Sequence, residues 1–212
     1  MPYCPKCGLR ILEGDARFCP NCGAILPQFK AGERRIAWTG TLLQRAIVFF
    51  TIFILCIFVT LVGALTKIDL LKAREMVDEM NKIENILRGT DVGIQLIFGN
   101  NLMYTLGMFV PIVGPGLGFY VLYNTGLVIS AFSTIYKINP LSTLLLLFIF
   151  PHAWMEYTAY ALAISESFWL IYAAIKRRFR DELILMSIIV VICNILLLLG
   201  ALTEIAVIAA SY

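Results

Sequence analysis

Long runs of apolar residues without a formal charge constrain this chain more than any other feature. A helix of about 20 such residues spans the roughly 30 Å hydrocarbon core of a bilayer. Of the 212 residues, 60% are hydrophobic and 15% are charged, against about 45–50% and about 25% in soluble domains. The clearest runs lie at residues 46–65, 92–110, 117–136 and 183–203. We therefore expect an all-α integral membrane helical bundle of about five transmembrane helices.

The fourth predicted helix is the hardest to delimit. Residues 141–175 carry two formal charges, Glu156 and Glu166, and contain Pro151. The ten residues 141–150 before Pro151 are only about half as many as a transmembrane helix needs, so the segment does not accommodate two spans. We expect one proline-kinked span at 141–164 and then an inner interfacial helix at 166–180, because aromatic and basic residues together suit the headgroup region. A re-entrant structure over residues 141–176 is the alternative.

The charged segment after the first run has the period of a helix. Apolar residues recur three or four positions apart, as Ala73, Val77 and Met80 do. This pattern predicts an outer amphipathic helix at residues 68–88, which lies on the membrane surface or on the rest of the protein.

Four cysteines near the N-terminus form two Cys-x-x-Cys pairs, each followed by glycine: Cys4 with Cys7, and Cys19 with Cys22. Two such turns bring four thiolates into the tetrahedral geometry that zinc prefers. A thioredoxin-like redox pair would need a βαβ context, and an iron–sulfur cluster is the remaining alternative. We predict a structural zinc ribbon at residues 1–26. Its metal supplies the folding free energy, because so short a segment buries too little surface.

The distribution of Lys and Arg orients the remaining chain, a basic connector at 27–45 and a transmembrane domain at 46–212. With the N-terminus inside, inner segments hold eleven of these residues, seven in 1–45 and four in 176–180. Outer segments hold six, five in 67–88 plus Lys137. The positive-inside rule then puts the N-terminus in the cytosol and the C-terminus outside the plasma membrane. A reducing cytosol also suits zinc-binding thiolates.

Several polar residues fall inside the predicted spans: Asn100 and Asn101 in the second, Asn124 in the third, His152 and Glu156 in the fourth. His152 and Glu156 are four residues apart, so they share a helix face and can pair. An ionisable residue in a span is a hypothesis of function by default, and we predict an intramembrane polar site from these five residues. The alternative is structural, because Asn and His side chains also join helices by hydrogen bonds.

Three short motifs follow one another along the membrane segment: Phe98-Gly-Asn-Asn101, Leu122-Tyr-Asn-Thr-Gly126 and Pro151-His-Ala-Trp-Met-Glu156. Together they resemble the stage II sporulation protein M family of membrane proteins, over about residues 45–210. The chain departs from that family at Ala153, where the family has glycine, and at Thr125, which separates Asn124 from Gly126. The resemblance implies a helical membrane bundle and, for the founding member, a scaffold for wall-remodelling enzymes. The added zinc ribbon suggests an archaeal version.

Three functions compete at this point. The first is a non-enzymatic membrane scaffold or accessory subunit whose zinc ribbon docks a cytosolic partner. The alternative is a channel or transporter with a midplane polar site around His152 and Glu156. An intramembrane hydrolase is the weakest hypothesis, since one His and one Glu fall short of the His-Glu-x-x-His of metalloproteases.

Expected partners follow from these hypotheses. They are the lipid bilayer, a protein in the membrane or the cytosol, and a second copy of the chain. The net charge of +3 is too small to indicate nucleic acid, which we do not expect as a partner.

Overall fold

The computed structural model describes residues 3–10, 18–25, 40–89 and 92–210 and divides the chain into two units, Met1–Ala37 and Trp38–Tyr212. Most of the predicted basic connector falls on residues 26–39, outside the described residues. The end of that connector belongs to the second unit, and its last residue, Arg45, lies inside a helix rather than before one.

The described part of the first unit consists of two matching turns. One isolated antiparallel bridge joins Tyr3 to Arg10, and another joins Phe18 to Ile25. Burial in these turns is concentrated at Cys4 and Cys19. Such short turns bury little apolar surface, so their cysteines must hold them together.

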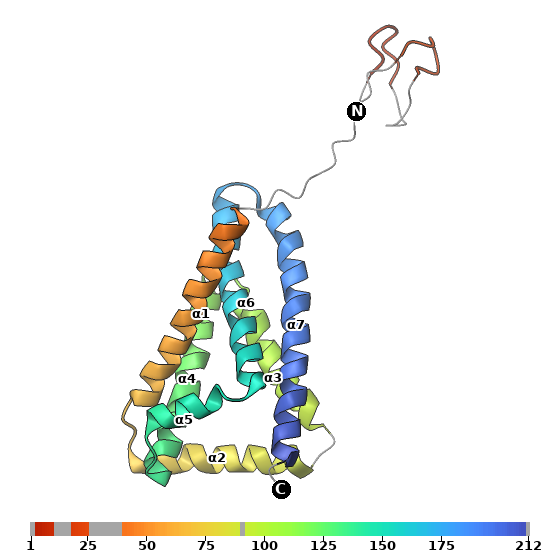
Figure 1. Cartoon of the computed structure of the whole chain (residues 1–212). Helices are drawn as coiled ribbons and strands as arrows, with labels where there is room; N and C mark the ends of the chain where they lie inside the picture. Colours follow the sequence, from red (N-terminus) through yellow and green to blue (C-terminus); the bar gives the residue numbers. More distant parts are fainter. Residues whose placement is uncertain (1–2, 11–17, 26–39, 90–91, 211–212) are drawn as a thin grey trace. The chain divides into compact units, whose positions relative to one another are not determined.

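Helices make up nearly all of the described second unit (Figure 1). They are α1 (Leu42–Leu65), α2 (Leu70–Gly89), α3 (Gly93–Met108), α4 (Val113–Tyr136), α5 (Pro140–Leu147), α6 (Pro151–Ile175) and α7 (Phe179–Ala210). Among the described residues, four helices are long and apolar enough to cross a membrane, namely α1, α4, α6 and α7. These four support a membrane protein, and the fifth predicted crossing stays a prediction.

Helix α3 occupies the position of that fifth crossing. Its 16 residues extend about 24 Å at 1.5 Å per residue, short of a roughly 30 Å hydrocarbon core. A tight turn shortens it, because Ile112 has a positive φ of 71° and the backbone at Gly114 folds back on α3. A Cβ at Gly114 would lie 2.0 Å from the carbonyl oxygen of Met108. Helices α3 and α4 therefore form a close antiparallel hairpin.

The region around Pro151 differs from the expected kinked span and interfacial helix. Two separate helices meet there: α5 ends at Leu147, and α6 runs for 25 residues from Pro151 without a break at Ser165. Proline suits the first turn of a helix and restrains the residue before it from continuing one, so Pro151 starts a helix instead of bending it. Residues 166–175 are thus the last part of a membrane-length helix, and α7 begins at Phe179.

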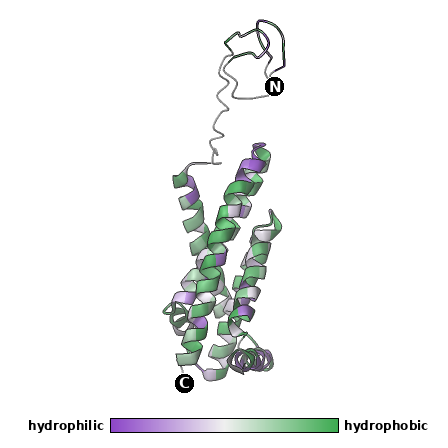
Figure 2. Cartoon of the chain, turned by 90° about the vertical axis from the view of Figure 1, so that its right-hand side faces the viewer, coloured by the Kyte–Doolittle hydropathy of each residue, from purple (hydrophilic) through white to green (hydrophobic). Residues whose placement is uncertain are grey.

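Helix α2 closely covers the segment for which the pattern predicted an amphipathic helix. It lies across the end of the bundle where α1 and α7 end, and Figure 2 views it nearly along its axis. Ala73 and Val77 are buried against Ala131 of α4, while most of its charged side chains are exposed. The part of the apolar face around Ala73 and Val77 therefore packs on the bundle, whereas Met80, Ile83 and Ile86 are exposed.

Close packing sets the position of the remaining helices. Helix α1 contacts α4 through glycines, since a Cβ at Gly126 would lie 2.2 Å from the Thr60 carbonyl oxygen. Helix α6 contacts α1, α3, α4 and α7, and 61% of its most apolar segment is buried. Helix α6 is thus the most enclosed of the four membrane-length helices, and its polar side chains lie close to several neighbouring helices.

Candidate functional site

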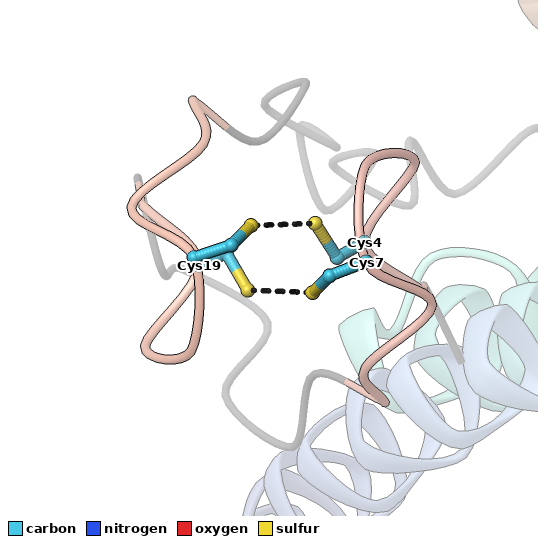
Figure 3. Close-up of side chains that lie close together, drawn as sticks. Cys4, Cys7 and Cys19 are labelled. Carbon is cyan, nitrogen blue, oxygen red and sulfur yellow. Dashed lines mark hydrogen bonds between the residues drawn. The ribbon is translucent and has the colours of Figure 1, made fainter.

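The four N-terminal cysteines come together at one point between the two turns (Figure 3). The Sγ atoms of Cys4 and Cys22 are 3.6 Å apart, as are those of Cys7 and Cys19, and all four lie within 4.8 Å of one another. Tetrahedral zinc with Zn–S bonds of about 2.3 Å places its sulfur atoms about 3.8 Å apart. The thiols therefore fit a zinc ion closely.

Each turn holds its cysteines by the same local structure. Gly8 and Gly23 have φ values of 70° and 66°, a conformation that glycine adopts at little cost. Their N–H groups donate to the carbonyl oxygens of Cys4 and Cys19, both at 2.9 Å. This hydrogen bond closes the turn and explains why glycine follows each Cys-x-x-Cys pair.

The backbone also prepares the thiols for a metal. The N–H of Leu9 lowers the pKa of Cys7 to about 6, which favours the thiolate that binds metal. The N–H of Ala24 acts in the same direction on Cys22, but lost hydration and the three neighbouring thiols outweigh it and raise that pKa to about 12. Four thiolates so close together need a cation between them.

Residues 3–26 match the family model of the zinc-ribbon domain. The match confirms the predicted zinc ribbon, and its four cysteines are those that the geometry brings together. No curated protein and no solved structure matches the chain. The family model covers the ribbon alone.

In the membrane unit, four of the five predicted polar residues line one cavity. It has a volume of about 490 Å³ and receives side chains from α2, α3, α4, α5 and α6. Asn100 and Asn101 enter from α3, Asn124 from α4 and Glu156 from α6. Residues far apart in sequence thus share one space, which we call the Glu156 cavity.

One hydrogen bond joins two of these residues directly. The Asn101 Nδ2 donates to Glu156 Oε1 at 2.6 Å, and the second carboxylate oxygen of Glu156 accepts no hydrogen bond from the described residues. Asn124 Nδ2 donates to the carbonyl oxygen of Tyr120, one turn earlier on α4, at 2.7 Å. Glu156 therefore has one fixed oxygen and one that is free of protein donors.

His152 does not join this group. Its ring stacks on Phe150 with centroids 5.7 Å apart, and its Nδ1 is buried without a hydrogen-bond partner among the described residues. Because His152 sits in the first turn of α6, its ring packs back on the residue before Pro151. The expected pairing of His152 with Glu156 is replaced by the bond from Asn101.

Glu204 of α7 is a neighbour of Glu156 that sequence reasoning missed. The two carboxylates interact electrostatically, and Glu204 is partly buried. In the sequence, Glu204 falls just outside the predicted span 183–203, and it was therefore not included in the predicted site. The signal that pointed inward was the length of the apolar run, because α7 continues for six residues beyond Glu204.

A second polar cluster lies near the other end of α6 and was not predicted at all. Arg45 of α1 donates from Nη1 to Glu166 of α6 at 2.8 Å and from Nη2 to Glu182 of α7. All three residues are at least 92% buried, with exposed fractions of 8%, 4% and 1%. The guanidinium also lies 4.7 Å from the ring centroid of Trp169. We call this the Arg45 cluster.

The Arg45 cluster links three helices by charge. Its members are 121 and 137 residues apart in sequence, so the cluster forms only when the bundle does. Buried charges are tolerated when they are paired and hydrogen-bonded, and removing the guanidinium would leave two carboxylates uncompensated. The arrangement acts as a clamp on α1, α6 and α7.

Proposed function

We propose that this protein is a non-enzymatic membrane scaffold or accessory subunit whose zinc ribbon docks a cytosolic partner protein. The observation that carries the proposal is the surface of the ribbon. Tyr3, Phe18 and Ile25 are 63%, 61% and 77% exposed, although large apolar side chains are normally buried. Phe18 and Ile25 are paired across a bridge, so they form one apolar patch on the second turn.

This patch is separate from the metal site. The four cysteines point their sulfur atoms toward one another, while the apolar side chains are exposed. An exposed apolar patch on a small, metal-folded module suits contact with another protein. The same scaffold in other proteins also binds nucleic acid, but a contact through apolar side chains does not favour a polyanion.

The proposal is tested by separating the patch from the fold of the ribbon. The double variant Phe18→Ser, Ile25→Ser keeps all four cysteines and should keep its zinc, measured as metal per chain. A protein that co-purifies stoichiometrically from native membranes in mild detergent should be lost with this variant and kept with Asn21→Ala, an exposed change in the same turn. Reproducible isolation of the wild type alone would overturn the proposal.

The orientation that we propose has the N-terminus and the ribbon in the cytosol and the C-terminus outside the plasma membrane. It is supported by the arrangement of the second unit, where α1 begins at the end at which α6 joins α7 (Figure 1). That end carries the basic segment Lys176–Arg180. The opposite end carries α2, so the positive-inside rule favours this orientation if α3 and α4 together cross and return.

The resemblance to the stage II sporulation protein M family is part of the same proposal. Its support is the hydrogen bond from Asn101 to Glu156, which joins the first of the three motifs to the last. Asn124, from the middle motif, lines the same cavity. Residues from all three motifs therefore line the Glu156 cavity.

A second candidate function is that of a channel or transporter with a solute site in the Glu156 cavity. The convergence of Asn100, Asn101, Asn124 and Glu156 on one space favours it. If hydrogen bonding between helices alone explained these residues, a closed contact would serve, whereas a volume of about 490 Å³ lies in the range of small-molecule sites.

Access of water to the cavity tests this second candidate. Thr125 lines the cavity, and Thr125→Cys changes its shape little. The new thiol should react with water-soluble thiol reagents in lipid nanodiscs. Thr51→Cys is the matched control, because Thr51 is an exposed residue of the membrane-length helix α1 and its hydroxyl makes the same kind of backbone hydrogen bond. Equal, slow reaction of both thiols would remove this candidate.

A further inference from the structure

The Glu156 cavity contains a carboxylate but no basic side chain to balance it. The described residues that line it include Glu156, three asparagines and several tyrosines, and none of them is Lys or Arg. A carboxylate at membrane depth is costly unless a cation or a proton compensates it. The Asn101 amide supplies one hydrogen bond but no charge, so the cavity is complementary to a cation whenever Glu156 is ionised.

The size of the cavity separates an organic cation from a metal ion. Hard metal ions need several oxygen ligands at about 2.0–2.6 Å, so their sites are small. A volume of about 490 Å³ leaves most of the space unfilled by one ion. A compound of several non-hydrogen atoms fills it better.

Aromatic rings give the cavity its second property. Tyr104 of α3, Tyr120 of α4, and Tyr157 and Tyr160 of α6 all line it. The faces of aromatic rings attract ammonium groups, by about 0.5–2 kcal/mol each depending on desolvation. Four tyrosines from three helices around one carboxylate are typical of a site for an ammonium group and its alkyl substituents.

The asparagines add hydrogen-bond acceptors. Asn101 and Asn124 each use their amide N–H to donate to other groups. Their Oδ1 atoms accept no hydrogen bond from the described residues. Unused acceptors favour a ligand that carries N–H or O–H donors.

From the carboxylate, the tyrosines, the free acceptors and the volume, we infer that the Glu156 cavity binds a small organic ammonium compound with Glu156 as its counter-ion. The inference rests on the second candidate function, and it specifies the chemical class of the solute. Glu156 supplies the charge, the tyrosines contact the alkyl groups, and the asparagines accept hydrogen bonds from polar substituents.

The charge preference of the cavity can be measured by labelling. In nanodiscs, the Thr125→Cys variant is treated with two thiosulfonate reagents of similar size, one bearing trimethylammonium and one bearing sulfonate. The cationic reagent should react faster, on the order of tenfold after correction for the intrinsic rates on a free thiol. Adding Glu156→Gln should abolish the preference, while Glu79→Gln, an exposed carboxylate of α2, should leave it unchanged.

Protection of the same thiol identifies the class of ligand. Choline should slow its modification by the sulfonate reagent, whereas its uncharged isostere 3,3-dimethylbutan-1-ol and sodium chloride at equal concentration should not. Protection by choline should disappear with Glu156→Gln.

Each other outcome has a distinct meaning. A Thr125→Cys thiol that reacts no faster than Thr51→Cys overturns the second candidate function itself. A reactive thiol without charge preference, or one protected equally by the neutral isostere or by sodium, leaves a water-filled cavity and overturns the ammonium site.

Discussion

Two carboxylate sites lie along α6, and their charges are compensated in different ways. Glu166 meets the guanidinium of Arg45, which the chain itself supplies. Among the described residues, Glu156 accepts a hydrogen bond from the neutral amide of Asn101 alone, and it lines a cavity. The two residues are ten positions apart, about 15 Å along a helix. The comparison shows that a carboxylate inside a helical bundle does not by itself indicate function. What distinguishes a structural carboxylate from a binding one is whether the chain itself supplies its counter-charge.

Helix α7 contributes a carboxylate to each site, Glu182 to the Arg45 cluster and Glu204 to the surroundings of Glu156. The Arg45 cluster is almost completely buried, whereas the lining of the Glu156 cavity combines buried side chains such as Tyr157 with exposed ones such as Tyr120. We therefore interpret the first as a structural clamp and the second as a binding site. The following predictions test that difference.

Removing zinc from the ribbon should have the largest effect on folding, and it should leave both carboxylate sites unchanged. Structural zinc contributes about 10–16 kcal/mol to the folding of ribbon-sized peptides. Removing zinc with a chelator should abolish hydrogen-exchange protection in residues 3–25 while protection in α1, α6 and α7 stays constant. Zinc affinity should also fall as the pH is lowered, because protons compete for the thiolates. Loss of protection in α6 would show that the two units fold together.

Arg45→Ala should be the most damaging change within the membrane unit. It leaves Glu166 and Glu182 buried without their cation, a loss of about 3–5 kcal/mol. We expect a large drop in the thermal unfolding midpoint in nanodiscs. The triple variant Arg45→Met, Glu166→Gln, Glu182→Gln removes all three charges and should recover most of the stability. Failure of the triple variant to recover would contradict the clamp as an electrostatic device.

Asn101→Ala should destabilise the membrane unit less than Arg45→Ala. The substitution removes the donor to Glu156, and a hydrogen bond to a charged group contributes about 1.5–3 kcal/mol. We expect the lower end of that range, because the cavity lets water replace the amide. Asn194→Ala is the control, since Asn194 donates only within α7, to the Val190 carbonyl oxygen. Equal effects of the two changes would mean that the contact between Asn101 and Glu156 has no special role.

The smallest effects on stability should come from the two glutamine substitutions on α6. Glu166→Gln leaves a one-to-one pair of Arg45 with Glu182, and Glu156→Gln keeps the hydrogen bond to Asn101. Each should change the unfolding free energy by about 1 kcal/mol, the typical value for single substitutions. The two variants should nevertheless differ in ligand response, with Glu166→Gln behaving as wild type and Glu156→Gln losing the response.

How much of this was predictable depends on how far apart the residues lie in sequence. The zinc ribbon could be predicted because its cysteines lie within one short segment, and their spacing determines the geometry of the metal site. They are Cys4, Cys7, Cys19 and Cys22. The long apolar helices could likewise be predicted from the composition of their segments. The boundary at Pro151 was misjudged, because a proline that starts a helix and one that kinks it produce the same local pattern.

The membrane sites were only partly predictable. Polarity at membrane depth singled out Asn100, Asn101, Asn124 and Glu156, and they share one cavity. The same reasoning paired His152 with Glu156, since helical spacing gives neighbours on one helix but not the helix opposite. The Arg45 cluster was not predicted, because Arg45 is the last residue of the basic connector and the sequence places it before the first span. In the folded protein, the packing of α1 against α6 buries the Arg45 side chain beside Glu166.

The most direct test of the central claim is the thermal unfolding of wild type and Glu156→Gln in nanodiscs, with and without choline. A ligand at 100 times its dissociation constant stabilises the folded state by about 2.7 kcal/mol. We predict that choline raises the unfolding midpoint of the wild type and of Glu166→Gln but not of Glu156→Gln, and that potassium chloride has no differential effect. An equal shift in wild type and Glu156→Gln, or no shift at all, would contradict the account of Glu156 as the counter-ion of an external ammonium compound.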